Sequence, residues 1–345
     1  MTLGEFVEKK AIEAISVSIN ETQKDPFLCV PPKSPQPSTR LQPLVVFAEH
    51  RSGTNLFFDM LGAHSRLSEA TKRRHPDVET LTLHELFAPY DTDHWRQVAE
   101  VKRKASKTCL LDDSKWVNPN SNSTSQASIY NTIDTVLGER LEEPEAVLGL
   151  LHQLPSFADK GYYAFKVFSQ HLRKGALGGT PTRAVEMVQG IDQGSKFVIL
   201  WRRRMIETFV SFELAKLTGK WVNFNSSMEA APETVTLDRK DLQKFVDTER
   251  EYYLSIKHAL EDKGLNFAVF EYGQDMQDAE SQTSTIKRLE RLLGHHGKSL
   301  ADSAISHLKL AKQQQKELHD VVENWDEVVA WGYGGQVEEW EDLFA

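Results

Sequence analysis

Two short polar segments follow apolar runs and carry the side chains that bind oxyanions. The first, residues 51–55, comes directly after the apolar run 44–48 and contains an arginine, two hydroxyls, an amide and a glycine. An arginine fork fits phosphate or sulfate, the other side chains add donors, and a glycine lets the backbone approach a ligand closely. These residues are Arg51, Ser52, Gly53, Thr54 and Asn55. They predict a phosphate cradle at the start of a helix, without the spacing of a Walker loop.

The second segment is the run of arginines 202–204, which follows the apolar run 197–201. Three consecutive arginines are typical of a solvated surface, but these come directly after residues that must be buried. Ser211 lies eight residues after Arg203, on a stretch whose apolar residues have helical spacing. The pattern predicts a second anion site.

Alternating strands and helices must position both segments. Short apolar runs predict strands that are buried on both faces, at 44–48, 162–168, 196–201 and 266–270. Apolar residues at helical spacing follow the first, third and fourth of these. This order is typical of an α/β fold, here a P-loop-like parallel sheet flanked by helices, with helical N- and C-terminal extensions. Because ligands bind beyond the carboxyl ends of such strands, we expect both anion sites at one edge of the sheet.

The composition divides the chain into three parts. Residues 1–42 combine an amphipathic helix with a proline-rich arm, and residues 43–295 form the α/β domain. Residues 296–345 form an acidic helical extension, which we expect to pack on the same domain. Polar stretches at 118–128 and 223–236 predict solvated loops, with lids as the alternative.

Charge and cysteine content restrict the partners and the compartment. The 345 residues include 41 Lys and Arg against 50 Asp and Glu, and this net charge of −9 argues against a nucleic-acid binder. Two cysteines cannot build a disulfide framework, and no apolar run is long enough for a membrane span. Charged residues interrupt the first twenty positions, so we expect no secretory signal and a cytoplasmic protein. His295 and His296 lack partners at metal-ligand spacing, so we interpret them as surface residues.

Taken together, the two polar segments resemble motifs of sulfotransferases that use 3′-phosphoadenosine 5′-phosphosulfate (PAPS). The segment 51–56 is similar to their 5′-phosphosulfate loop, and Arg203 followed by Ser211 is similar to their 3′-phosphate clamp. Other segments resemble the bacterial-type branch, which includes nodulation-factor and glycolipid sulfotransferases. These segments are 165–168 with His171, 200–204, 215–221 and 270–272. The resemblance spans residues 43–295.

The resemblance implies a donor site and a reaction. Residues Arg51 to Asn55 would hold the 5′-phosphosulfate, and Arg203 with Ser211 would hold the 3′-phosphate of this co-substrate. The sulfuryl group would pass directly to a hydroxyl or amine of a small-molecule or carbohydrate acceptor, without a metal. Such a transfer requires positioning, charge stabilisation and a base for the acceptor proton.

Two residues compete for the role of base. Glu69, just past the first expected helix, resembles the catalytic glutamate region of the bacterial-type enzymes. His171 follows the second expected strand, where cytosolic sulfotransferases carry a catalytic histidine. The non-catalytic alternatives are a surface carboxylate and a partly buried structural histidine. Lys166 would neutralise the leaving phosphate, or else pair with a carboxylate as an ordinary strand lysine.

Other functions stay open on the sequence alone. The motif Asp91-Thr92-Asp93 matches a short pattern of metal-dependent glycosyltransferases. Intact anion sites without a working base would suit a non-catalytic nucleotide-binding protein. A kinase would need a Walker lysine, which residues 51–55 do not supply. The patterns leave open the identity of the acceptor and whether the chain forms a homodimer.

Overall fold

Successive side chains of the central strand enter two different cores, one on each face of the sheet. In the computed structural model, Val45 and Phe47 of β1 (Thr39–Phe47) pack in one core, and Leu44 and Val46 pack in the other. The part of a strand that is buried on both faces is mostly apolar, which explains why no polar residue interrupts the run 44–48. The same alternation holds in the strands on either side of β1.

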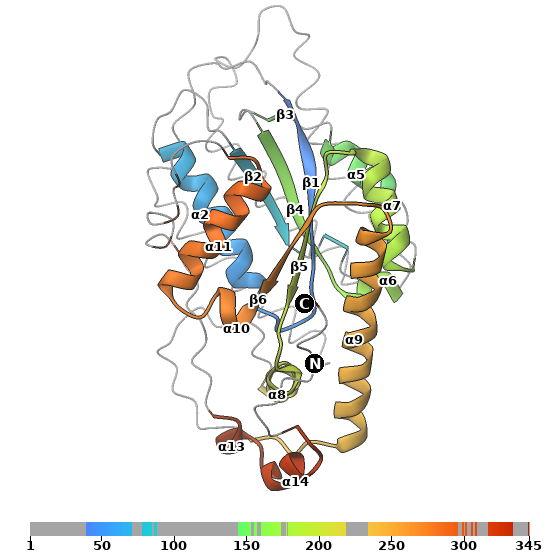
Figure 1. Ribbon diagram of the computed structural model, residues 1–345, viewed down its shortest axis with the longest axis vertical. Coiled ribbons are helices and arrows are strands. Elements are labelled where there is room, and N and C mark those ends of the chain that lie inside the picture. Colours follow the sequence, from blue (N-terminus) through green and yellow to red (C-terminus); the bar gives the residue numbers. More distant parts are fainter. Residues whose placement is uncertain are drawn as a thin grey trace, which may run out of the picture.

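Five parallel strands form the main sheet in the order β2-β4-β1-β5-β6 (Figure 1). The other four strands of this sheet are β2 (Val78–His84), β4 (Lys160–Val167), β5 (Lys196–Trp201) and β6 (Phe267–Glu271), and a short β3 (Pro155–Ser156) pairs antiparallel with the start of β1. All five carboxyl ends therefore lie at one edge. The structure describes residues 39–70, 78–84, 86–87, 144–152, 155–156, 160–173, 177, 179–218, 234–295, 299, 301, 305, 308, 317–333 and 344.

Helices cover both faces of this sheet (Figure 1). One face carries α2 (Thr54–Ala70) and α11 (Ala279–Leu292), and the other carries α5 (Pro144–His152), α7 (Pro181–Ile191) and α9 (Arg239–Glu261). Three further helices, α6 (Ser169–Arg173), α8 (Met205–Thr218) and α10 (Tyr272–Asp275), follow β4, β5 and β6. The expected α/β class, with a parallel sheet flanked by helices, is confirmed.

Some element boundaries differ from the sequence expectation. β1 begins at Thr39, inside the expected proline-rich arm, and it tolerates Pro43 because its pairing with β5 starts only at Leu44. β2 was not expected, because its threonines alternate with apolar residues as in an edge strand. α2 continues through Ala70, beyond the end that the apolar spacing indicates. Residues 1–38, which include the expected N-terminal helix, lie outside the described residues.

The segment 317–333 of the C-terminal extension packs on α9 and on the residues before it. It contains α13 (Leu318–Val321) and α14 (Trp325–Ala330). Asn324 exchanges two hydrogen bonds of 3.0 Å with the backbone of Leu237, and Tyr333 Oη donates to Gln243 Oε1 at 2.6 Å. These bonds attach residues 317–333 to the face of the sheet that α9 covers. No helix in the described chain is long and apolar enough to cross a membrane.

Candidate anion-binding site

The turn from β1 to α2 has an unusual backbone. Arg51 has φ 67° and Gly53 has φ 85°, so two residues of the turn adopt the left-handed conformation that favours glycine. Both the N–H and the Oγ of Ser52 donate to the carbonyl oxygen of Glu49, at 3.2 and 2.6 Å. The turn leads into the first turn of α2, where helical N–H groups have no intrahelical acceptor. Its shape and its place suit an anion.

Gly53 is required by a neighbouring aromatic ring as well as by its φ angle. A Cβ atom added to Gly53 would overlap the Cδ2 and Cε2 atoms of Tyr272, which begins α10 after β6. The sequence analysis assigned this glycine to close approach of a ligand. The structure adds a second reason, because the Tyr272 ring packs directly on the turn.

Arg51 connects the two segments that the sequence predicts as separate anion sites. Its Nε donates to Ser211 Oγ on α8 at 2.8 Å. The side chain therefore runs from the β1–α2 turn to the helix that follows β5, across the carboxyl edge of the sheet. The structure brings these two predicted residues together, so both segments border one region.

The three consecutive arginines diverge after β5. Arg202 is buried, with 5% of its surface exposed, and its guanidinium carbon lies 4.3 Å from the centroid of the Tyr272 ring. Arg203 is half-buried, and its backbone N–H donates to Glu271 Oε1 at 3.1 Å. Arg204 is exposed and forms an ion pair with Glu207 at 2.6 Å. The sequence predicted Arg203 as the clamp, whereas the arginine buried beside Tyr272 is Arg202.

Arg51 and Arg202 are close enough to act on each other electrostatically. Burial is the main cause that lowers the pKa of Arg51, and the charge of Arg202 lowers it further. Burial raises the pKa of Tyr272, and both arginines oppose this rise. Two neighbouring cations repel each other, and a bound anion would relieve this repulsion.

A third cation lies next to the start of α2. Lys166, near the end of β4, is 2% exposed, and its Nζ donates to Asn55 Oδ1 at 2.8 Å. The ammonium also lies 5.5 Å from the centroid of the Phe58 ring and 5.8 Å from that of Phe168. The structure thus brings together two predicted site residues, Lys166 and Asn55.

Two residues of the turn were missed by the sequence analysis. Glu49 is buried and accepts a hydrogen bond of 2.7 Å from the N–H of Ser169, which starts α6. Burial raises its pKa, and the charge of His50 and the bonds from Ser169 oppose the rise. The half-buried ring of His50 lies 4.3 Å from Phe168 and 6.2 Å from Phe212, between centroids. Their position directly before Arg51 was the available signal, because it places them in the turn itself.

The two predicted bases are unfavourably placed for proton transfer at this turn. His171 has no exposed surface, and its Nδ1 accepts a hydrogen bond of 3.2 Å from the N–H of Phe168. Glu69 was expected just past the first helix, but it belongs to the last turn of α2. It comes fifteen positions after Thr54 in the helix, which corresponds to about 22 Å along the axis. The side chain of Glu69 lies outside the described residues, but its place in the backbone argues against the role of base.

Several other predicted residues cannot be placed. Asp91, Asp93 and the polar stretch 118–128 lie outside the described residues, as does most of the stretch 223–236. In the part of the chain that is described, no group of three or more His, Cys, Asp or Glu residues is arranged to hold a metal ion.

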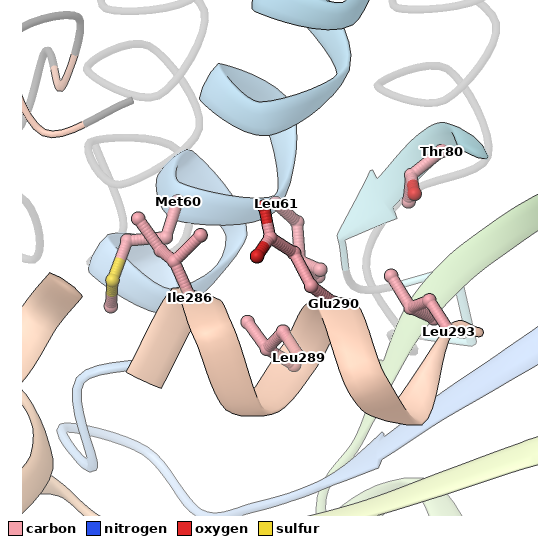
Figure 2. Close-up of a pocket in the computed structure, with 7 residues that line it drawn as sticks. All are labelled: Met60, Leu61, Thr80, Ile286, Leu289, Glu290 and Leu293. Atoms are coloured by element: carbon pink, nitrogen blue, oxygen red, sulfur yellow. The ribbon is translucent and has the colours of Figure 1, made fainter. Parts of the chain in front are cut away.

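A small apolar pocket lies away from the turn, between α2, β2 and α11 (Figure 2). Met60 and Leu61 come from α2, Thr80 from β2, and the remaining lining residues from α11 and the residue that follows it. These are Ile286, Leu289, Glu290 and Leu293. A cavity of about 10 Å³ holds at most one water molecule, so this pocket belongs to the packing of the core.

Comparisons of the chain with protein-family models, curated proteins and solved structures give no match.

Proposed function

We propose that the chain is a sulfotransferase that moves the sulfuryl group of PAPS to a hydroxyl or amine of a small-molecule or carbohydrate acceptor. One observation carries the proposal: Arg51 of the β1–α2 turn and Ser211 of α8 meet at the carboxyl edge of a parallel sheet. By resemblance, these residues belong to the two segments that hold the two anionic ends of one nucleotide. Their contact supports a single donor site.

The site supplies the electrostatic part of such a reaction. The acceptor oxygen attacks sulfur, and the bridging S–O bond to the 5′-phosphate breaks as the new S–O bond forms. The leaving 3′,5′-bisphosphate keeps the electron pair, so positive groups near the turn stabilise the transition state. Arg51 and Lys166 are the side chains at the turn suited to this role, together with the N–H groups at the start of α2.

The acceptor proton requires a base at the same edge. β2 ends at this edge with His84, which is in register with Phe165 of β4. The next residue in the sequence is Glu85, which lies outside the described residues. In the sequence Glu85 directly follows this strand end, whereas Glu69 lies in the last turn of α2. We therefore include Glu85 as a candidate base.

Ligand binding separates this proposal from its alternatives. We would measure the melting temperature of the full chain with 3′,5′-adenosine bisphosphate, with UDP-glucose plus Mn²⁺, and with ATP plus Mg²⁺. A ligand at 100 times its Kd adds about 2.7 kcal/mol of stability, which is readily detected. We expect a response to the bisphosphate alone. No response to it would contradict the proposal, and a response to UDP-glucose with Mn²⁺ would favour the glycosyltransferase.

A transfer assay then tests catalysis. Labelled PAPS would be offered with carbohydrates, alkaloid-like amines, steroids and phenols, and labelled product would be measured. Bisphosphate binding without transfer to any acceptor class would favour the non-catalytic nucleotide-binding protein. Transfer to one class would identify the acceptor chemistry.

A further inference from the structure

Arg202 is a buried cation whose guanidinium hydrogen-bonds to Tyr272 and leaves other donors unused among the described residues. Only 5% of its surface is exposed, and its Nε and Nη1 have no hydrogen-bond partner among the described residues. Buried guanidinium groups are normally paired, because leaving a charged donor unsatisfied in the interior is unfavourable. An unsatisfied buried arginine therefore points to a ligand.

The nearest carboxylate does not neutralise this arginine. Glu207 Oε2 lies 4.0 Å from Arg202 Nη1, at the limit of an ion pair. The other oxygen of the same carboxylate is 2.6 Å from Arg204 Nη1, so Glu207 is already engaged by an exposed arginine. The positive charge of Arg202 is thus only weakly compensated by the described residues.

The surroundings of Arg202 connect it to the β1–α2 turn. Its guanidinium lies over the ring of Tyr272, and the same ring packs on Gly53. The charge of Arg202 also lowers the pKa of Arg51, the residue two positions before Gly53. The side chain therefore belongs to the turn side of the site, whereas Arg203 is held through its backbone by Glu271.

We propose that Arg202, together with Arg51, binds the 5′-phosphosulfate end of the donor, and that it is not part of the 3′-phosphate clamp. This inference rests on the proposed function and adds a ligand that the resemblance does not assign. A tetrahedral oxyanion between two guanidinium groups accepts hydrogen bonds from both and offsets their mutual repulsion. The ring of Tyr272 keeps the Arg202 guanidinium in place through a cation–π contact.

Ligands that carry only one of the two anionic groups test the assignment. Adenosine 5′-phosphosulfate has the 5′ group alone, and 3′-AMP has the 3′ group alone. We expect Arg202→Met to weaken binding of adenosine 5′-phosphosulfate about 10- to 100-fold, the loss expected for a charge-assisted bond, and to change the Kd of 3′-AMP less than twofold. The matched variant Arg203→Met should show the reverse pattern. Calorimetric titration of the full chain gives all four values.

A control on folding accompanies the titration. Because Arg202 repels Arg51, the ligand-free melting temperature of Arg202→Met should not fall below that of the wild type. If Arg202→Met does not fold, Arg202→Lys replaces it, because lysine keeps the charge but lacks the guanidinium fork. We expect this variant to bind adenosine 5′-phosphosulfate 3- to 10-fold more weakly than the wild type, about the cost of losing the fork geometry, and to bind 3′-AMP unchanged.

The outcomes separate the inference from the proposed function. If the wild type binds none of these nucleotides, the proposed function is wrong. If the wild type binds them and both Arg202 variants bind the 5′ ligand as tightly as the wild type, the inference is wrong while the proposed function stands. A selective loss of 3′-AMP binding in the Arg202 variants would also overturn it, by placing Arg202 in the 3′ clamp.

Discussion

Arg51 Nε lies 2.8 Å from Ser211 Oγ, although 160 residues separate them in the chain. The bond joins the turn after β1 to the helix after β5, which are neighbouring strands of the sheet. This side-chain hydrogen bond therefore joins the two halves of the proposed donor site. A nucleotide that uses both residues must replace this bond with bonds of its own.

Ser211→Ala removes this contact, and its effects should appear in both stability and binding. Without the hydroxyl, the half-buried Arg51 loses an acceptor, so we expect a loss of about 1 kcal/mol in the free energy of unfolding. The affinity for 3′,5′-adenosine bisphosphate should fall about tenfold, as expected for one lost hydrogen bond to a charged group. Urea unfolding and calorimetric titration measure the two effects. Ser255→Ala on α9 is the control, because it removes a helix serine away from the turn; an equal loss of affinity in both variants would contradict the prediction.

Arg203→Ala should weaken binding of the bisphosphate about 10- to 100-fold, because a charge-assisted contact to the 3′-phosphate is lost. The neighbouring Arg204→Ala is the matched control, since Arg204 is exposed and paired with Glu207. We expect the control to bind within twofold of the wild type in a titration at fixed ionic strength. Similar losses in both variants would show that the arginine run acts only through its total charge.

Gly53→Ala should destabilise the protein more than Gly179→Ala. Both glycines have φ 85°, but an added Cβ meets the Tyr272 ring at Gly53 and nothing within 4 Å at Gly179. The left-handed conformation alone costs a residue with a Cβ about 1–2 kcal/mol, which is the loss we expect for Gly179→Ala. The overlap with Tyr272 adds to this cost at Gly53. Equal losses in urea unfolding would show that Tyr272 moves aside freely.

The sequence was sufficient for the buried parts of this fold and insufficient for its edges. The runs that became β1, β4, β5 and β6 are recognisable because a strand covered on both faces is mostly apolar, although β4 contains the buried Lys166. β2 lies at the sheet edge and alternates polar with apolar residues, so its run does not stand out. Boundaries were also missed where Pro43 sits inside a strand and where α2 continues without a stop signal.

The candidate site also has features that the sequence specifies and features that it does not. The segment 51–55 and Ser211 were identified from residue type and position, because strand ends in a parallel sheet share one edge. Which arginine of the run 202–204 turns inward depends on the turn after Trp201, and the sequence does not specify this. Glu49 is polar yet buried, because the N–H of Ser169 provides a partner that only the pairing of β1 with β4 brings near.

Glu85→Gln should abolish transfer while sparing nucleotide binding, and Glu69→Gln should remain active. The reason is position: β2 ends at the site edge one residue before Glu85, whereas Glu69 lies in the last turn of α2. A lost base reduces turnover about 100- to 10,000-fold. The assay compares kcat with labelled PAPS and the Kd of the bisphosphate for both variants. Full activity of Glu85→Gln together with loss in Glu69→Gln would reverse the assignment.

Glu49→Gln should become more stable relative to the wild type as the pH rises. Burial raises the pKa of Glu49 in the folded state above its usual 4.5. At a pH between 4.5 and this raised pKa, the folded state therefore holds a proton that the unfolded state has released. The stability of the wild type therefore falls as the pH rises through this window and then levels off above the folded pKa. Glutamine cannot ionise, and its amide oxygen still accepts the bond from Ser169, so the variant lacks this penalty.

Urea unfolding of wild type and Glu49→Gln between pH 4 and pH 8 measures the difference. Glu323→Gln provides a control of opposite sign, since Thr234 and Thr236 lower the pKa of that exposed carboxyl. A carboxyl whose pKa is lowered in the folded state stabilises the wild type at a pH above its pKa in the unfolded state, and this stability is lost as the pH falls through the folded-state pKa. The free energy of unfolding of Glu323→Gln should therefore fall relative to that of the wild type as the pH rises. If Glu49→Gln instead differs from the wild type by a constant amount at every pH, then Glu49 titrates normally in the folded state and its burial is matched by its partners.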